Sequence, residues 1–459
     1  IDGGNKWDVI SPDLSRESWD IPAAVGIYTK EEMKKMPRRG VIYTVAPSYV
    51  DINTIWCGTD DGLIHVTKDG GKTWTNVTPP AITSWSKVSL MDASHTNANT
   101  AYAAVNRIRC DDQRPHIYRT MDGGKTWKEI VNGLPNDPIN VVKEDPVRKG
   151  LLFAGSARAV YVSFDDGANW ESLRLNMPAT SIRDLVIKDD DLVIGTHGRS
   201  FWILDDITPL RQMYNQLLNQ PAILFKPQNT YRVRWSMYPD TPVPPDEPAG
   251  QNPPDGAIIN YYLASNAANV QLDILDSKGN QIHKYTSTDT MYTIPPNNVP
   301  PYWIRPQQIL SAKSGAHRFM WDMHYQPLNV PPSYPISATP MNTAPDPTSP
   351  WVMPGTYTAR LTVDGKIYDQ SFTVKKDPRV KTSAKDLQLQ HDLSLSCYNY
   401  IKKCKNDLKA VSDKDRLAEV RKYLGSFTGL QNTLQDGDWP PTTQLIKAVN
   451  ETVAAYEAM

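Results

Sequence analysis

A short turn-and-tryptophan sequence recurs in the first third of the chain and limits what this region can fold into. Residues 67–74 read TKDGGKTW, residues 120–127 read TMDGGKTW, and residues 163–170 read SFDDGANW. A shorter copy at residues 1–7 reads IDGGNKW. The shared pattern is S/T-x-D-x-G-x-x-W, and apolar, β-branched runs flank the full copies, which are strand signals. We therefore expect each copy to join two strands of one repeated unit.

Each residue type in the pattern has a structural use. The Asp side chain accepts hydrogen bonds from N–H groups of its own turn, and Gly supplies a positive φ. The Trp then covers the base of the hairpin and buries a large apolar area. We predict structural rather than catalytic roles for the aspartate and tryptophan of each copy, namely Asp2, Trp7, Asp69, Trp74, Asp122, Trp127, Asp165 and Trp170.

The spacing of the copies predicts a β-propeller. The four aspartates are 67, 53 and 43 residues apart, and a four-stranded blade takes about 40–45 residues. Residues 1–208 are therefore predicted to form propeller blades, the C-terminal part of a larger propeller, with incomplete blades at both ends. Such an arc leaves edge strands bare, which proteins avoid. Because the sequence opens inside a repeat, we expect a fragment or processed product whose ring is completed by preceding sequence or by a companion chain.

The remainder of the chain changes character twice. Residues 209–221 predict a linker helix, and residues 222–379 predict an immunoglobulin-like β-sandwich from alternating strands and Gly turns. Two Pro-rich loops, at 239–254 and about 326–354, interrupt this domain. Residues 380–459 predict an α-helical C-terminal region. The predicted fold class is mainly β: a partial propeller, then an immunoglobulin-like β-sandwich, then a small α-helical segment.

Composition excludes some partners and suggests a compartment. The net charge of −1 over 459 residues gives no electrostatic footprint for nucleic acid. No apolar run approaches the roughly 20 residues of a membrane span. The 13 Trp and 38 Pro residues are typical of extracellular modules, so we expect an extracytoplasmic protein, either secreted, periplasmic or on the cell surface. Cys57 and Cys110 lie in neighbouring predicted blades; they form either a disulfide or two buried free thiols.

The repeat pattern is the Asp-box (BNR repeat) of certain β-propellers, and the chain resembles a group of large bacterial extracytoplasmic proteins related to sortilin-type propellers. Members of the group are often labelled glycosyl-hydrolase-like. Residues 195–207, GTHGRSFWILDDI, carry the resemblance most clearly, with support from residues 58–64, 107–120 and 161–167. The resemblance implies a longer N-terminal region but no established activity, because Asp-boxes occur in sialidases, xyloglucanases and sortilins alike.

Two polar clusters are candidate ligand-binding sites. The first lies in a loop before the second full copy and consists of Arg107, Arg109, Asp111, Asp112, Arg114 and His116. Its arginines can bind a carboxylate or sugar and its aspartates can act as acid and base; the alternative is an ion-pair network that holds the loop. The second cluster follows a predicted strand and consists of His197, Arg199 and Trp202. It predicts recognition at the rim of the ring; the alternative is that these residues cap the sheet.

The sequence lacks the motifs of several enzyme classes. There is no Gly-x-Ser-x-Gly elbow, no His-Glu-x-x-His helix, no Cys-x-x-Cys pair and no phosphate loop. No cofactor, metal or catalytic residue is predicted. The first hypothesis is a non-catalytic secreted or cell-surface propeller that binds protein or peptide partners within a larger assembly. The alternative is a glycan-active hydrolase, sialidase-like or xyloglucanase-like, with part of its active site in further N-terminal blades.

Overall fold

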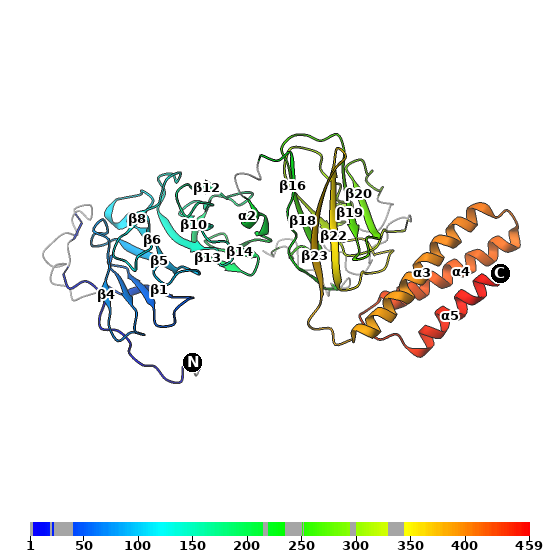
Figure 1. Cartoon of the computed structure of the whole chain (residues 1–459), viewed down its shortest axis with the longest axis horizontal. Helices are drawn as coiled ribbons and strands as arrows, with labels where there is room; N and C mark the ends of the chain where they lie inside the picture. The colour runs from blue at the N-terminus through cyan, green and yellow to red at the C-terminus, as the bar shows by residue number, and fades with distance from the viewer. Residues whose placement is uncertain are drawn as a thin grey trace. The chain divides into compact units, whose positions relative to one another are not determined.

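The structure, a computed structural model, describes residues 3–18, 21–22, 40–213, 219–234, 250, 252–293, 300–328 and 344–459. The chain divides into two compact units, Ile1–Tyr214 and Asn215–Met459 (Figure 1). The boundary falls inside the linker helix predicted at 209–221; α2 (Thr208–Gln212) is helical there, whereas the described residues 213 and 219–221 are not. Asp2 and most of the two Pro-rich loops lie outside the described residues.

In its described residues, the first unit contains four antiparallel sheets in chain order, which we call blades 1 to 4. Blades 1 to 3 have four strands each and blade 4 has three, always paired in the order in which they occur along the chain. The strands of blades 1 and 2 are β1 (Ile42–Pro47), β2 (Ile55–Thr59), β3 (Ile64–Thr67), β4 (Thr75–Asn76), β5 (Lys87–Ala93), β6 (Ala101–Asn106), β7 (Ile117–Thr120) and β8 (Lys128–Glu129). Those of blades 3 and 4 are β9 (Ile139–Glu144), β10 (Leu152–Ser156), β11 (Val160–Ser163), β12 (Glu171–Ser172), β13 (Ser181–Lys188), β14 (Asp191–His197) and β15 (Phe201–Leu204).

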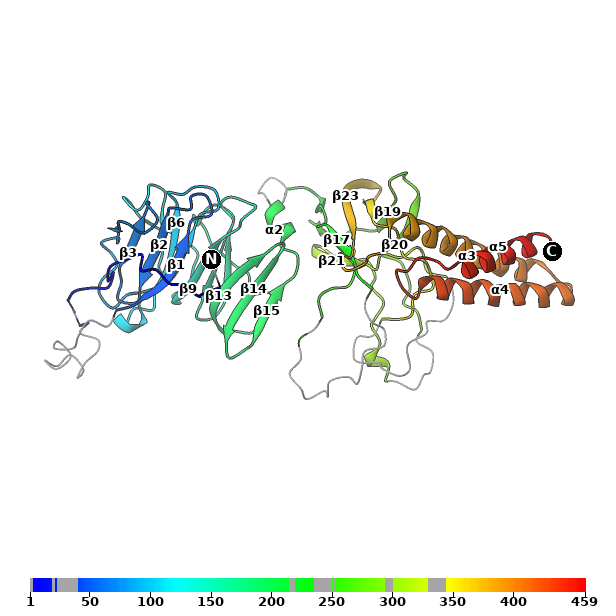
Figure 2. The ribbon, with the colours of Figure 1, turned by 90° about the horizontal axis from the view of Figure 1, so that it is seen from below.

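The blades are arranged side by side around their first strands. β1 packs against β5, β5 against β9, and β9 against β13, so the four sheets form an arc (Figure 2). A separate apolar core fills each junction; Ile64 and Val66 of blade 1, for example, pack with Val88 and Met91 of blade 2. Similar cores lie between blades 2 and 3 and between blades 3 and 4. Consecutive meander sheets packed face to face about a common centre are the propeller-like arrangement predicted for this region.

The second unit begins with two sheets that share one core. The first contains β16 (Ala222–Leu224), β18 (Ala257–Leu263) and β21 (Gly315–Trp321), and the second contains β17 (Thr230–Arg232), β23 (Lys366–Lys376), β22 (Gly355–Val363), β19 (Val270–Leu275) and β20 (Gln281–Thr286). A short 3-10 helix, η3 (Pro301–Trp303), lies in the connection before β21. Apolar side chains of both sheets form the core, including the fully buried Trp321. β17 pairs with β23 in parallel. The immunoglobulin-like identity of this unit remains a prediction.

Three helices close the chain, as the sequence predicts: α3 (Ala384–Ala410), α4 (Lys414–Gln435) and α5 (Thr443–Glu457). Each helix begins at a polar N-cap residue: Ser383, Asp413 and Thr442, respectively. The side chain of each N-cap residue accepts the backbone N–H of the residue three positions later. Asp438, between α4 and α5, accepts from Arg232 at 2.7 Å and from Arg234 at 2.9 Å, which ties the helices to the sheets. Within the described ranges, no helix combines the length and the apolar character needed to cross a membrane.

Candidate functional site

The three full repeats form nearly identical turns, which we call box turns 1 to 3 (residues 67–74, 120–127 and 163–170). In box turn 1, Asp69 accepts the Thr73 N–H at 2.9 Å, the Thr73 hydroxyl at 2.6 Å and the Thr67 hydroxyl at 2.8 Å. Asp122 and Asp165 accept equivalent bonds in the other two turns. The hydroxyl and N–H of Thr73 lower the pKa of Asp69 to about 2. These carboxylates are occupied within their own turns and are poorly suited to catalysis.

The tryptophans reach further than the sequence suggested. We expected each Trp to cover its own hairpin, but its indole N–H donates to a carbonyl of the preceding repeat. The three bonds are Trp74 to Ile10 at 2.8 Å, Trp127 to Val77 at 2.7 Å and Trp170 to Ile130 at 2.8 Å. Each acceptor lies three residues after the Trp of the preceding copy. The repeat therefore links successive blades, and that register explains why it recurs once per blade.

Glycine is required in the box turns for a steric reason as well. A Cβ added to Gly124 would lie 2.6 Å from Val77, and one added to Gly167 would lie 2.4 Å from Ile130. Both glycines also have positive φ. Trp7 in the short first copy differs from the others, because it is 87% exposed and donates only to Gly4 of its own turn, at 3.0 Å.

The structure gathers most of the first predicted cluster around one carboxylate, in the loop between β6 and β7 that contains the 3-10 helix η2 (Ile108–Cys110). Asp112 lies 3.1 Å from Arg107, 2.9 Å from Arg114 and 3.1 Å from the Nε2 of His116. The hydrogen bond from the Arg114 side chain, with smaller contributions from other donors, holds the pKa of Asp112 well below its usual range. The Nδ1 of His116 lies 2.7 Å from Glu129.

The outer residues of this loop point to blade 1. Arg107 donates to the carbonyl of Ala81 at 3.0 Å, and Arg109 reaches Asp60 at 3.4 Å. Asp111 is exposed and ends η2 in the left-handed conformation, with a φ of 56°. The charged groups of this loop thus form an ion-pair network within blade 2, and two of its arginines also reach blade 1 and the segment after it.

The second predicted cluster lies on the turn between β14 and β15. His197 and Arg199 are exposed there, and the Trp202 indole donates to the Arg199 carbonyl at 2.9 Å, which closes the turn. Both this turn and the β6–β7 loop join the second and third strands of a blade. In successive meander sheets these connections lie on the same rim, so the two clusters share a rim but belong to blades 2 and 4.

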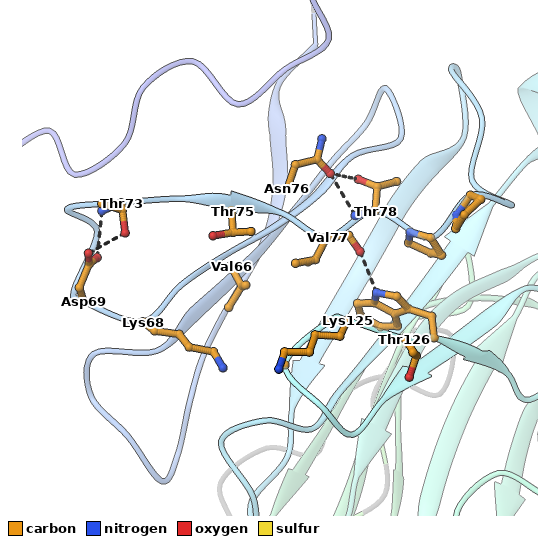
Figure 3. Close-up of a pocket in the computed structure, with 15 residues that line it drawn as sticks. Val66, Lys68, Asp69, Thr73, Thr75, Asn76, Val77, Thr78, Lys125 and Thr126 are labelled. Atoms are coloured by element: carbon orange, nitrogen blue, oxygen red, sulfur yellow. Dashed lines mark hydrogen bonds between the residues drawn. The ribbon is translucent and has the colours of Figure 1, made fainter.

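A groove at the outer edge of blades 1 and 2 was not predicted from the sequence. It has a volume of about 710 Å³ and lies between β4 with the segment after it and box turn 2. Figure 3 shows Lys68 and Lys125 extending from the two box turns into the same space. Lys68 donates to Asn99 at 2.8 Å. Trp127 and the pair Pro79 and Pro80 add apolar walls.

The groove is open because the chain leaves the outer strands of blades 1 and 2 along different paths. After β8 the chain turns back over box turn 3. There the backbone carbonyl of Asn132 accepts the backbone N–H of Trp170 at 3.0 Å, and the Trp170 side chain is buried. After β4 the chain instead runs into Pro79 and Pro80, and the Pro79 carbonyl accepts the Ile82 N–H at 3.0 Å. Trp127 therefore remains partly exposed. The Pro-Pro step after a box turn is the sequence signal that would have indicated this groove.

The structure contains no disulfide between Cys57 and Cys110. Cys57 and Cys110 are both free thiols. Cys57 is buried on β2, beside Gly58, whose added Cβ would meet Val88 of blade 2 at 2.3 Å. Because successive strand residues face opposite ways, Cys57 points away from blade 2, where Cys110 lies. Among the described residues, no group of three or more His, Cys, Asp or Glu side chains is placed to hold a metal ion.

No family model and no curated protein matches the chain. Among solved structures it is similar to the GH74 enzyme of Niastella koreensis, at 15% identity over 34% of this chain and 26% of that one, with a TM-score of 0.29. YCF48 from Cyanidioschyzon merolae matches at 21% identity over 37% of this chain and 54% of that one, with a TM-score of 0.29. YCF48 bound to D1 peptide matches at 15% identity over 54% and 69%, also at 0.29. The matched region thus spans about a quarter of the first protein and about half of the second, and no activity or partner is carried over from either.

Proposed function

We propose that this chain is a non-catalytic, extracytoplasmic propeller-type protein that binds an extended acidic peptide segment of a partner protein within a larger assembly. The observation that carries the proposal is the groove between blades 1 and 2. Its volume of about 710 Å³ lies in the range of pockets that accept ligands, roughly 300–1,000 Å³. The extracytoplasmic setting is inferred from the Trp-rich and Pro-rich composition.

The backbone beside the groove suits an extended peptide. β4 is the edge strand of blade 1, and its residues Thr75 and Asn76 are exposed. An edge strand offers unpaired backbone groups, to which a peptide can add as a further strand. The partly exposed ring of Trp127 and the adjacent prolines would then contact alternate peptide side chains.

The charge of the groove decides the peptide chemistry. The ammonium groups of Lys68 and Lys125 enter the groove (Figure 3), whereas the Asp69 carboxylate is engaged by Thr67 and Thr73 within its own turn. The excess of positive charge favours Asp or Glu side chains on the partner. The loop around Asp112 receives no catalytic role in this proposal, because its carboxylate is held by three basic side chains.

Binding of a labelled peptide tests the proposal. A fluorescein-labelled nine-residue peptide that alternates Glu with Val and Pro should bind the full chain, and its Glu→Gln counterpart should bind at least about tenfold more weakly, equivalent to about 1.4 kcal/mol. Lys125→Glu should weaken binding of the acidic peptide to a similar extent. Lys72→Glu is the matched control, because Lys72 is exposed on box turn 1 but does not line the groove.

Two results would overturn the proposal. Equal affinity for the acidic and the amide peptide would remove the charge argument, and loss of binding in both lysine variants would place the interaction outside the groove. Hydrolysis or binding of a glycan that Lys125→Glu leaves intact, but Asp111→Asn abolishes, would favour the glycan-active alternative instead.

A further inference from the structure

Within the second unit, the sheets and the three C-terminal helices have separate apolar cores that meet at a polar boundary. The sheet core surrounds Trp321, and the helix core contains Phe427 and Tyr456. Besides the Asp438 bonds described above, side-chain hydrogen bonds cross this boundary from the Trp351 N–H to Gln435 at 2.9 Å, from Gln431 to the Thr348 carbonyl at 3.1 Å and from Tyr398 to the Gln326 carbonyl at 2.6 Å. We call this boundary the sheet–helix junction.

Three of the eight histidines in the chain lie at or beside the sheet–helix junction. His283 on β20 and His324 after β21 are buried, at 5% and 4% exposure. The His283 ring is hydrogen-bonded to the backbone of His324. His391 on α3 is itself a link across the junction, because its Nε2 lies 3.2 Å from the Tyr325 hydroxyl.

The geometry around His324 suits a neutral imidazole and opposes a charged one. Its Nδ1 lies 2.8 Å from the Asp322 carbonyl, which can only accept, so Nδ1 carries the hydrogen of the neutral ring. The ring packs on Trp351, with centroids 4.1 Å apart, and Nε2 is buried without a hydrogen-bond partner among the described residues. A proton on Nε2 would therefore place a charged N–H where these residues offer no acceptor, which is costly.

The charged groups around His324 act in both directions, and burial outweighs them. The Asp322 carboxylate lies 3.6 Å from Nδ1 and favours the protonated form, but it is 62% exposed, and Arg232 and Arg234 oppose protonation. Burial is the largest cause that lowers the pKa of His324, and it also lowers the pKa of His283 and that of His391. The other titratable groups facing the three rings or the two arginines are Tyr285, Asp289, Asp392, Asp436 and Asp438.

We propose that the sheet–helix junction is a pH-dependent switch, in which protonation of its histidines releases α3, α4 and α5 from the sheets while both cores stay folded. Docking holds the pKa of each histidine below the ordinary 6.5, so docking is strongest above pH 6.5 and weakens as the pH falls. After release the imidazoles reach water and take up protons freely. The docking equilibrium constant then falls about tenfold per pH unit for each proton taken up.

Amide exchange of the full 459-residue chain, resolved at single residues, tests this switch. The Trp351 N–H reports docking, because it donates to Gln435 across the junction. The neighbouring Val352 N–H donates to the Met323 carbonyl at 2.9 Å on the sheet side, so the ratio of the two exchange rates removes the direct effect of pH on exchange. From about pH 7.5 to about pH 5.5 the Trp351/Val352 ratio should rise at least about tenfold, while the amide of Ile401 inside α3 stays protected.

Two variants test whether the histidines cause the change. His324→Phe keeps a ring under Trp351 but cannot take up a proton, so the ratio should rise less steeply as the pH falls. Asp322→Asn removes an exposed carboxylate that favours the protonated form of His324, so the midpoint of the rise should move to lower pH. His317→Gln is the matched control, because His317 lies on β21 and bonds the Lys313 carbonyl at 2.6 Å; its profile should equal that of the wild type.

Three results would overturn the proposal. The first is a wild-type ratio that does not change with pH, and the second is loss of Ile401 protection together with that of Trp351, which indicates unfolding of the helices. The third is a midpoint in Asp322→Asn that stays in place or moves to higher pH; this variant decides the case if His324→Phe prevents docking at every pH. The switch lies in the second unit and the peptide groove in the first, so neither set of results bears on the other proposal.

Discussion

Replacing Trp170 by alanine removes the most deeply buried of the inter-blade links. Trp170 is 4% exposed, and its indole N–H donates to the Ile130 carbonyl at 2.8 Å. Truncating a buried Trp to Ala costs about 3–5 kcal/mol, which includes the cavity that remains. In a unit of this size, Ile1–Tyr214, each kcal/mol lowers Tm by about 2–4 °C. Trp170→Ala should therefore lower the Tm of the first unit by about 6–20 °C.

The assay is differential scanning calorimetry of the full chain, with two comparison variants. Trp170→Phe keeps an aromatic ring but loses the donor, so it should cost only about 1–2 kcal/mol. Trp74→Ala removes the same link, to Ile10 at 2.8 Å, but from a partly exposed position, and should cost clearly less than Trp170→Ala. A decrease of less than about 2 °C for Trp170→Ala, or an equal loss for Trp74→Ala, would refute the burial argument.

Three further predictions concern the carboxylates and thiols of the first unit. The pKa of Asp69 and that of Asp122 are held at about 2, against a usual 3.8, so the stability that these carboxylates contribute should be complete above about pH 4 and be lost as the pH falls towards 2. The urea midpoint of unfolding should therefore drop over this pH window, and it should drop less in Asp122→Asn. Asp112→Asn should cost about 1–3 kcal/mol and speed amide exchange in the β6–β7 loop, because three basic groups lose the carboxylate charge that they share; unchanged exchange would contradict the network. Alkylation under denaturing conditions without reductant should modify all four cysteines, and two fewer additions would indicate a Cys57–Cys110 disulfide. Burial raises the pKa of the Cys57 thiol to about 12, so Cys57 should react only after unfolding.

The prediction of a mainly β chain, with propeller-like sheets first and helices last, is confirmed. The box turns explain why this was possible, since Asp69 takes its hydrogen bonds from Thr67 and Thr73, within eight residues. Likewise, the N-caps Ser383, Asp413 and Thr442 act on backbone three residues away. Interactions of such short range are visible in the sequence itself.

The candidate sites were predicted less well. The sequence placed several charged residues in one loop, but it did not identify Asp112 as their common acceptor, which depends on the path that the loop takes through η2. It gave no indication that Lys68 and Lys125 enter one groove, because 57 residues separate them in the chain. The choice between a Cys57–Cys110 disulfide and two free thiols, which the sequence left open, depends likewise on the face of β2 on which the Cys57 thiol lies.

What the sequence by itself determined is the repeating unit: its turns, its strand order and the period at which tryptophan returns. The acceptor of each tryptophan was decided only by the tertiary structure, because Ile10, Val77 and Ile130 belong to the neighbouring repeat. The physical reason is how far apart in the chain the interacting groups lie. A turn satisfies its own polar groups locally, whereas a groove, a buried junction or an exposed end exists only once separate sheets are packed against one another.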